Sequence, residues 1–335
     1  MGRIYRVATT AAAYGGGGIG AAGLLGALLL VGQARLARYT IERVGVRPPA
    51  CDGTYGTEHD GEPIRLAMLG DSSAVGYGVD RPRDTPGALL AAGLAERLHR
   101  PVELHCFAVI GATSADLRPQ LEQVLAWPPD VAVVLIGAND VTQRIRPSGA
   151  VPHLSATVRA LHGTGAEVVV GTCPDLGAIR PIPQPLRWLA GQLSREMAAA
   201  QTVAVVEAGG FTVSLGNLLG RQFAASPEMF SVDRFHPSAA GYLAACAALL
   251  PTVLVAAGVP VEVEPVPAPG DGVRSLARAA AEAVDHAGTE VRGTKVAGQE
   301  RGPAGRWATL RHRLGARTER PQDPVEPAGV ADEMG

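Results

Sequence analysis

The chain has 335 residues, of which 47% are apolar and only 4% aromatic, so it is long enough for one or two domains with an aliphatic core. Its formal net charge of −2 gives no reason to expect nucleic acid as a general partner. The cysteines form no CxxC pair and no Cys/His pair at metal spacing, which argues against a zinc site and indicates buried free thiols. A disulfide is an alternative if the domain is exported. The cysteines are Cys51, Cys106, Cys173 and Cys246.

The first predicted element is an apolar segment at residues 1–34. Residues 7–34 carry no charge, and residues 19–31 are apolar enough for a membrane span, which needs about 20 residues. The length of the uncharged run favours an uncleaved membrane anchor. The small-x-small pattern Gly32-Gln33-Ala34 favours a cleaved signal peptide instead. Both hypotheses predict a membrane-anchored or exported protein, and a glycine-rich buried helix is a third alternative.

The arginines around this segment give opposite indications of its orientation. Two precede it and four follow it, at Arg3 and Arg6 and at Arg35, Arg38, Arg43 and Arg47. The excess of positive charge after the segment favours a cytoplasmic main domain, whereas the short basic N-terminus favours the reverse. Residues 35–63 contain Pro48-Pro49 and a patch rich in Gly, Asp and Thr, which is typical of a linker.

Strands and helices alternate from residue 64 to residue 257, which predicts a single α/β domain. Five apolar runs are predicted as strands, at residues 66–69, 102–109, 131–136, 167–171 and 202–206. Because the runs are almost continuously apolar, they are typical of parallel strands that are covered on both faces. The predicted fold class is therefore a doubly wound, five-stranded parallel sheet flanked by helices, similar to flavodoxin, with right-handed crossovers.

Helical patterns separate the strands. Leu90, Leu94 and Leu98 recur every four residues in a helix that begins near Thr85. The other helices are predicted around residues 117–125, 158–161, 185–200 and 237–250. A proline begins each of the last two, which suits the first turn of a helix.

The composition changes after the domain. Residues 258–335 are rich in Pro, Gly, Arg and Glu, with so little apolar surface that they are predicted to be a largely disordered tail. Six arginines at residues 301–320 leave contact with anionic lipid as an alternative.

Polar residues end the first strand abruptly. Gly70-Asp71-Ser72-Ser73 follows the apolar run, so Ser72 lies at the carboxyl end of a buried strand, where open α/β sheets bind their ligands. Alone, this motif is more typical of an ordinary strand-to-helix turn. A serine nucleophile also needs a base and a group that orients the base, so the rest of the sequence decides between the two interpretations.

A histidine with a nearby carboxylate lies just before the last helix. Asp233 precedes His236 by three residues, and in a turn this spacing lets the carboxylate reach the ring Nδ1 and leaves Nε2 free for a serine. Pro237 suits the first turn of the following helix and so fixes the position of His236. The other histidine with this spacing, His99 after Glu96, lies in a helical surface pattern.

Two further strand ends carry potential oxyanion donors. Gly111 ends the second strand, and without a side chain its N–H can approach a substrate oxygen closely. Asn139 ends the third strand, and its amide can donate to the same oxygen. The carboxyl ends of parallel strands meet at one edge of a sheet, so these groups and Ser72 are predicted to line one crevice.

These motifs together resemble the SGNH/GDSL hydrolase family of lipases and esterases. The four blocks of the family are matched in order by Gly70-Asp71-Ser72, by Gly111, by Gly137-Ala138-Asn139-Asp140 and by Asp233-Arg234-Phe235-His236. The resemblance covers residues 64–250. Two more segments look like those of membrane-associated or exported actinobacterial members, namely Thr172-Cys173-Pro174-Asp175-Leu176-Gly177 and Ala199-Ala200-Gln201-Thr202.

The resemblance implies a role for each site residue. Ser72 would be the nucleophile and His236 the base, oriented by Asp233. The oxyanion hole would consist of the N–H groups of Ser72 and Gly111 and the side chain of Asn139. No metal and no organic cofactor would be needed.

The predicted function is that of a serine esterase that hydrolyses small or lipid esters through an acyl-enzyme. Alternatives are a glycan O-deacetylase or a thioesterase of the cell envelope, because the family acts on many esters. An alternative of another class is a non-catalytic, membrane-tethered binding protein on a hydrolase fold. Apolar residues that indicate either an acyl site or core are Phe211, Leu215, Leu218 and Leu219.

Overall fold

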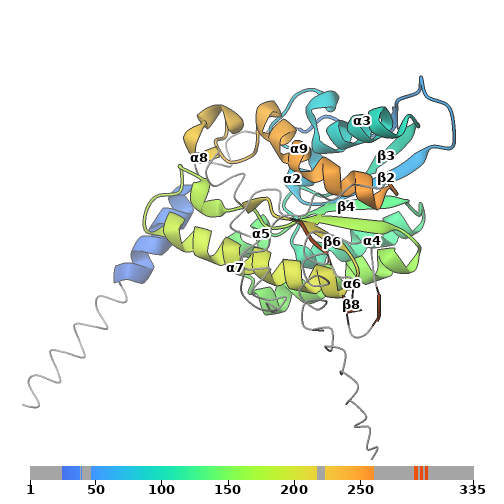
Figure 1. Cartoon of the computed structure of the whole chain (residues 1–335). Helices are drawn as coiled ribbons and strands as arrows, with labels where there is room; N and C mark the ends of the chain where they lie inside the picture. The colour runs from blue at the N-terminus through green and yellow to red at the C-terminus, as the bar shows by residue number, and fades with distance from the viewer. Residues whose placement is uncertain are drawn as a thin grey trace, which may run out of the picture.

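The apolar runs of the sequence form one central sheet (Figure 1). The computed structural model describes residues 25–37, 39, 47–216, 223–259, 290–292, 295–296 and 299–300. Within them the sheet has seven strands in the order β1-β3-β2-β4-β5-β6-β7. The five inner strands are parallel and are β2 (Ile64–Gly70), β3 (Val102–Cys106), β4 (Val131–Leu135), β5 (Glu167–Gly171) and β6 (Phe211–Val213).

Each edge of the sheet carries an antiparallel strand that the sequence did not predict. β1 (Gly53–Tyr55) pairs with β3, and β7 (Glu290–Arg292) pairs with β6. β1 lies inside the predicted linker 35–63 and β7 inside the predicted tail 258–335, so the sheet extends past both boundaries of the predicted domain. The arginine-rich residues 301–320 lie outside the described residues. A separate antiparallel pair is formed by β8 (Lys295–Val296) and β9 (Gln299–Glu300).

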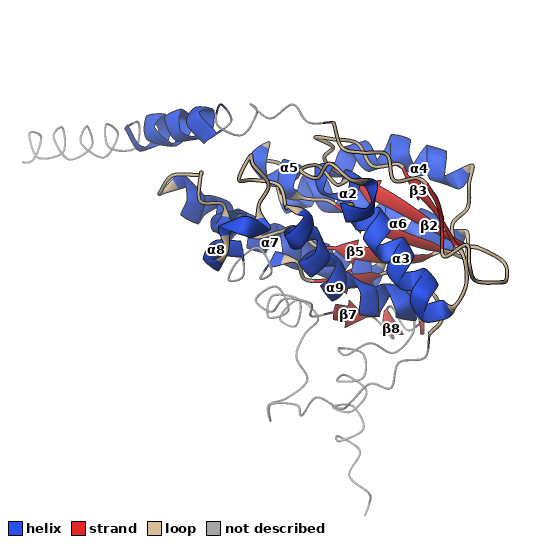
Figure 2. Cartoon of the chain, turned by 90° about the horizontal axis from the view of Figure 1, so that it is seen from above, coloured by secondary structure: helices blue, strands red, loops and turns tan. Residues whose placement is uncertain are grey.

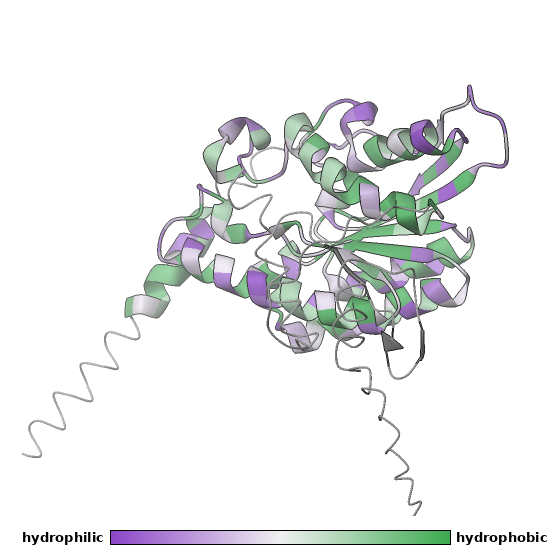
Figure 3. Cartoon of the chain, in the orientation of Figure 1, coloured by the Kyte–Doolittle hydropathy of each residue, from purple (hydrophilic) through white to green (hydrophobic). Residues whose placement is uncertain are grey.

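Helices cover both faces of the sheet (Figures 1 and 2). One face carries α3 (Pro86–Leu98) and α9 (Ala239–Ala256), and the other carries α4 (Leu117–Leu125), α6 (Pro147–Gly163) and α7 (Leu186–Glu207). Along β2, Leu66 and Met68 pack toward α3 and α9, whereas Ala67 and Leu69 pack toward the other three helices. The run Leu66–Leu69 is therefore apolar at successive positions, and Figure 3 shows the strands of the sheet as mostly hydrophobic. The predicted doubly wound fold is confirmed.

The predicted strand at residues 202–206 is wrong. These residues belong to α7, a helix of 22 residues, and the fifth parallel strand is the next apolar run, β6. The run Thr202–Val206 is apolar and rich in β-branched residues, a pattern that a strand shares with a buried helical segment. The helix continues through it because no breaker occurs before Gly209 and Gly210.

Short helices connect these elements. The segment after β2 forms α2 (Ser72–Val75), and Thr85 caps α3. The other short helices are α5 (Ala138–Thr142), α8 (Phe223–Ala225) and the 3-10 helices η1 (Pro82–Asp84), η2 (Ser114–Asp116), η3 (Leu176–Ala178) and η5 (Pro227–Met229).

The order of the parallel strands determines where a ligand can bind. Counted along the chain, the inner strands have the order 2-1-3-4-5, because β2 lies between β3 and β4. The chain leaves β2 toward one face of the sheet and leaves β3 toward the other face. In such sheets the crevice opens at the carboxyl ends of the strands where the connections diverge.

An apolar helix, Leu25–Ala37, contacts the domain at the connection between β5 and α7 (Figure 1, blue). Gln33 Nε2 donates to Gln184 O at 2.6 Å, and Gln33 Oε1 accepts from Leu186 N at 3.2 Å. Ala37 is buried against the domain. The end of the predicted anchor or signal segment therefore contacts the folded protein, whereas most of the helix before Gln33 is exposed. Its large apolar side chains that are more than half exposed are Leu25, Leu28, Leu29 and Leu36.

Among the described residues, α9 is the one helix that is long and apolar enough to cross a membrane. It packs on the sheet, where Leu249 and Val253 are fully buried, so its composition is that of a core helix.

Candidate active site

The end of β2 turns so sharply that only glycine fits. Gly70 has a φ of 128°, and a Cβ atom there would lie 1.9 Å from the carbonyl oxygen of Leu135 in β4. Asp71 then caps α2 by accepting a hydrogen bond from Ser73 N at 2.8 Å. Ser72 consequently occupies the first position of α2, 8% exposed, at the carboxyl edge of the sheet.

A short turn before α9 holds the histidine. Asp233 Oδ1 accepts a hydrogen bond from Ser231 Oγ at 2.7 Å. The same oxygen accepts from the backbone N–H groups of Phe235 at 2.8 Å and His236 at 2.9 Å. The other oxygen, Oδ2, lies 2.5 Å from His236 Nδ1. One carboxylate therefore positions both the backbone and the ring of His236, and Ser238 caps α9 directly afterwards.

The turn and the end of β2 meet, although they lie 164 residues apart in sequence. His236 Nε2 is 3.0 Å from Ser72 Oγ. Because Nδ1–H donates to Asp233, Nε2 is the ring nitrogen that can accept the serine proton. The imidazole packs against the rings of Tyr77 and Phe235, with centroid distances of 4.5 Å and 4.9 Å. The structure thus brings the predicted serine, histidine and aspartate into one hydrogen-bonded chain.

The pKa values of two buried carboxylates near this chain shift in opposite directions. Burial raises the pKa of Asp233, but hydrogen bonds from His236 and Phe235 outweigh burial and lower it to about 2. Burial raises the pKa of Asp71 to about 6, because hydrogen bonds from Ser73 offset only part of the desolvation. Asp233 therefore stays ionised well below neutral pH, and because it contacts His236 Nδ1 it is the carboxylate placed to stabilise a protonated imidazole.

Gly111 and Asn139 follow the strands on either side of β2. Gly111 lies in an exposed loop after β3 with a φ of 81°. The loop stays beside β2 because Val109 N donates to Gly70 O at 3.0 Å. Asn139 lies in α5 after β4, and its Nδ2 donates one hydrogen bond to Ala112 O at 2.9 Å. The amide retains a second N–H for another acceptor, so both predicted donors flank the end of β2.

Buried polar side chains to which the sequence assigned no role hold these strand ends together. Gln120 of α4 accepts from Gly70 N at 2.8 Å and donates to Gly70 O at 2.9 Å. Asp140 of α5 is fully buried and accepts from Ser114 Oγ at 2.9 Å and from Ser114 N at 3.1 Å. Gln201 of α7 completes this set, which we call the edge clasp (Gln120, Asp140 and Gln201). For Gln120 and Gln201 the sequence signal is a polar residue on an otherwise apolar helical stripe.

Gln201 joins the two additional segments that the family resemblance pointed to. Its Oε1 accepts from Cys173 N at 2.7 Å, and its Nε2 donates to Ile136 O at 3.0 Å. It therefore links the ends of β4 and β5 from the helix that packs beneath them. The neighbouring Asp175 pairs with Arg195 at 2.8 Å.

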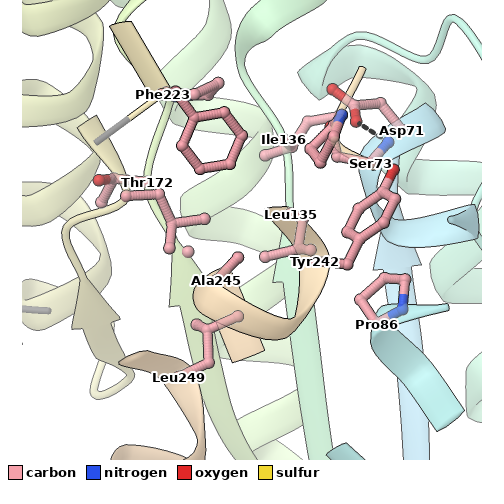
Figure 4. Close-up of a pocket in the computed structure, with 14 residues that line it drawn as sticks. Asp71, Ser73, Pro86, Leu135, Ile136, Thr172, Phe223, Tyr242, Ala245 and Leu249 are labelled. Atoms are coloured by element: carbon pink, nitrogen blue, oxygen red, sulfur yellow. Dashed lines mark hydrogen bonds between the residues drawn. The ribbon is translucent and has the colours of Figure 1, made fainter. Parts of the chain in front are cut away.

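A small apolar cavity of about 50 Å³ lies behind the nucleophile, on the α9 side of the sheet (Figure 4). Its lining includes Asp71 and Ser73 but neither Ser72 nor His236. The rest of the lining comes mainly from the ends of β4 and β5 and from α9, including Leu135, Ile136, Thr172, Tyr242, Ala245 and Leu249.

Of the apolar residues predicted to form either an acyl site or core, one lines this cavity and another lies in the core. Leu215 lines the cavity, and Phe211 is buried in the core. Leu218 and Leu219 lie outside the described residues. Across the part of the chain that the structure describes, no group of three or more His, Cys, Asp or Glu side chains could hold a metal ion.

A family model and a curated relative match the part of the chain that carries this site. The model of the GDSL-like Lipase/Acylhydrolase family matches residues 68–244. The GDSL-like esterase Rv1075c of Mycobacterium tuberculosis is 46% identical over 228 residues, which cover 64% of this chain and 72% of the relative. The family match includes Ser72, Asp233 and His236.

Similar solved structures are more distant. LAE5, an alpha/beta hydrolase enzyme from the metagenome of Lake Arreo, Spain, is 18% identical, with a TM-score of 0.47 over 57% of this chain and 96% of that chain. Axe2, an acetylxylan esterase from Geobacillus stearothermophilus, is 20% identical, with a TM-score of 0.46 over 58% of this chain and 95% of that chain. At these values the likeness carries no argument about substrate.

Proposed function

The chain belongs to the GDSL-like lipase/acylhydrolase family and is a carboxylic ester hydrolase, and from this premise we propose that Ser72, His236 and Asp233 form its catalytic triad. The observation that carries the proposal is the hydrogen-bonded chain from Asp233 Oδ2 through the imidazole to Ser72 Oγ, with distances of 2.5 Å and 3.0 Å. A serine hydroxyl is a weak nucleophile until an oriented base takes its proton, and this chain supplies that base.

In the first half-reaction, Ser72 Oγ attacks the ester carbonyl carbon while its proton moves to His236 Nε2. The ionised Asp233 stabilises the imidazolium through Nδ1. The oxyanion accepts hydrogen bonds from the N–H groups of Ser72 and Gly111 and from the second amide N–H of Asn139. The carbon–oxygen bond to the alcohol then breaks, and the alcohol leaves with the proton from Nε2.

In the second half-reaction, water takes the place of the alcohol. His236 Nε2 removes a proton from the water, whose oxygen attacks the carbonyl carbon of the acyl-enzyme. The same donors stabilise the second oxyanion. The bond to Ser72 Oγ breaks, the serine recovers its proton from His236, and the carboxylic acid leaves.

Replacement of the nucleophile tests this mechanism. The Ser72→Ala variant should lose p-nitrophenyl acetate hydrolysis and labelling by a fluorophosphonate probe while its circular dichroism is unchanged. Ser73→Ala is the matched control, because this hydroxyl is adjacent in sequence and lines the cavity behind the nucleophile. Full activity of Ser72→Ala, or a probe adduct on a peptide without Ser72, would disprove the assignment.

The acyl group and the alcohol distinguish an esterase for small or lipid esters from the two alternative hydrolases. A glycan O-deacetylase and a thioesterase would use the same triad. A series of p-nitrophenyl esters of increasing chain length, an acetylated oligosaccharide and an acyl thioester therefore measure the preference directly through kcat/KM. The non-catalytic alternative does not fit a carboxylic ester hydrolase.

We also propose that the N-terminal segment is retained as a membrane anchor. Two observations support this: the helix Leu25–Ala37 is hydrogen-bonded to the domain through Gln33, and it exposes leucines along its length. Fractionation of cells that express the full chain should place it with membranes, and Edman sequencing should find residues before Gly32. A soluble protein that begins at residue 35 would establish the cleaved signal peptide instead. Protease treatment of intact cells then reports which side the domain faces.

A further inference from the structure

Two cysteines far apart in sequence face each other across the edge of the sheet. β1 and β3 are antiparallel, with Tyr55 opposite Val102 and Gly53 opposite Leu104. Continuing this register by two residues brings Cys51 opposite Cys106. Directly opposite residues in antiparallel strands have Cα atoms roughly 4.5–5.5 Å apart, which is within the range of about 4.4–6.8 Å that a disulfide spans.

Local hydrogen bonds hold both backbones in this position. Asp52 Oδ1 accepts from Cys106 N at 2.9 Å, so a side chain continues the pairing where the regular ladder of β1 ends. Tyr55 Oη donates to Cys51 O at 2.7 Å. The segment before β1 is therefore fixed against β3.

The two side chains point to the same face of the sheet. Cys51 is buried in the cluster under α3, and Cys106 is partly buried against that cluster. The Cys106 thiol also lies 4.0 Å from Ala74 O of α2. A hydrogen bond from the Cys106 thiol lowers the pKa of Cys51, and the same bond together with burial raises the pKa of Cys106. The strand register and the opposite pKa shifts both indicate that the two thiols are neighbours.

The other two cysteines provide an internal contrast. Cys173 and Cys246 are buried, and desolvation raises the pKa of each thiol. Their thiols contact backbone carbonyl groups, those of Pro174 and Pro86 at 3.6 Å. They are matched controls for thiol chemistry in the same chain.

We propose that Cys51 and Cys106 form a cross-strand disulfide when the folded protein meets a disulfide oxidant, such as a dithiol oxidoreductase in its oxidised form or oxidised glutathione. Cys106, the partly exposed residue of the pair, loses its thiol proton and attacks one sulfur of the oxidant disulfide; the oxidant S–S bond breaks, one thiol is released and a mixed disulfide forms. The Cys51 sulfur then attacks the Cys106 sulfur, and the second thiol leaves. The cysteines lose two electrons and two protons, which reduce the oxidant disulfide to two thiols.

This bond would enclose the part of the chain that carries the nucleophile. Residues 51–106 include β2, Ser72 and α3, and β3 leads directly into the loop of Gly111. Closing a loop of this length restricts the unfolded chain, and we expect the melting temperature to rise by roughly 10 °C. The inference rests on strand register and does not depend on the proposed triad.

Thiol mapping of the full-length wild type tests the proposal. The protein is purified under reducing conditions, incubated with oxidised glutathione, denatured with N-ethylmaleimide and digested without reduction. The expected result is a peptide that links Cys51 to Cys106, with Cys173 and Cys246 alkylated. Alkylation of all four cysteines, or a disulfide between any other pair, would overturn the inference.

Variants make the test independent of peptide recovery. Cys51→Ser and Cys106→Ser should each lose the redox-dependent shift in melting temperature, and Cys246→Ala should keep it. Because each protein is compared with itself in reduced and oxidised form, a general loss of stability in a variant does not affect the result. An equal shift in Cys51→Ser and wild type would contradict the proposal.

Discussion

The two halves of the candidate site are built in different ways. The histidine half comes from one turn, in which Asp233 makes hydrogen bonds to residues at most three positions away. The half that carries the proposed oxyanion donors comes from the ends of three strands, and its loop is open, with Val109 and Ile110 about half exposed. The first half therefore depends on local chain geometry, and the second depends on tertiary packing.

The edge clasp explains how the open half keeps its geometry. Gln120 bonds to both backbone groups of Gly70, and Asp140 bonds to both donors of Ser114. These contacts lie behind the strand ends, away from solvent. An active site can thus expose its donors to substrate while buried polar groups position them from the core side.

Of the substitutions that test this comparison, loss of the base should have the largest effect on turnover. His236→Ala removes the proton acceptor and should lower kcat about 10⁴-fold or more, with the fold intact. The measurement is steady-state hydrolysis of p-nitrophenyl acetate. His153→Ala, at an exposed position of α6, is the matched histidine control and should retain wild-type rates. Equal rates for the two variants would contradict a role for His236.

Loss of one oxyanion donor should have a smaller effect. Asn139→Ala should lower kcat about 10²–10³-fold with little change in KM, because the donor acts on the transition state. Gln143→Ala, at the exposed end of α5, serves as control. A change confined to KM would show that Asn139 binds substrate rather than the oxyanion.

Asp71, which lies between the two halves of the site, should make the free energy of unfolding depend on pH. The pKa of Asp71 is raised from 3.8 to about 6, so the folded state holds this proton more tightly than the unfolded state. The associated stability is complete below pH 3.8 and is lost as the pH rises through 6, by about 3 kcal/mol for a shift of this size. Asp71→Asn retains an acceptor for Ser73 N but cannot ionise. Urea unfolding at pH 4.5 and 7.5 should therefore show the variant gaining stability relative to wild type at the higher pH, and an equal difference at both would contradict the assignment.

Loss of one hydrogen bond to the edge clasp should have the smallest effect on turnover. Ser114→Ala removes one hydrogen bond to the buried Asp140 and should lower the free energy of unfolding by about 1–3 kcal/mol. We expect kcat to fall less than in Asn139→Ala, because Asp140 keeps its bond to Ser114 N. Denaturant unfolding and kcat measured on one preparation test both parts. A larger loss of kcat than in Asn139→Ala would mean that the clasp itself controls the chemistry.

The sequence was sufficient to predict the parts of the molecule whose structure depends on short segments of the chain. The spacing of Asp233 and His236 predicted a local contact, and the apolar runs predicted the first four parallel strands. The fifth strand was misplaced because Thr202–Val206 has the composition of a strand and the length of the helix around it overrides that preference.

The parts that depend on distant contacts could not be predicted. β1 is short and polar enough to be typical of a linker, and only its pairing with β3 makes it a strand. Gln120 has no special neighbour in sequence, since its partner Gly70 lies 50 residues earlier. Its role becomes visible only when α4 packs beneath β2.

The position of His236 immediately before α9 has a mechanical consequence. Ser72 is attached to the sheet, whereas His236 is attached to a helix that lies over one face of it, with Leu249 and Val253 buried in the interface. The 3.0 Å distance between Ser72 Oγ and His236 Nε2 therefore depends on how closely α9 packs against the sheet. A substitution that leaves a cavity under α9, far from any reacting atom, should therefore lower kcat before it causes measurable unfolding.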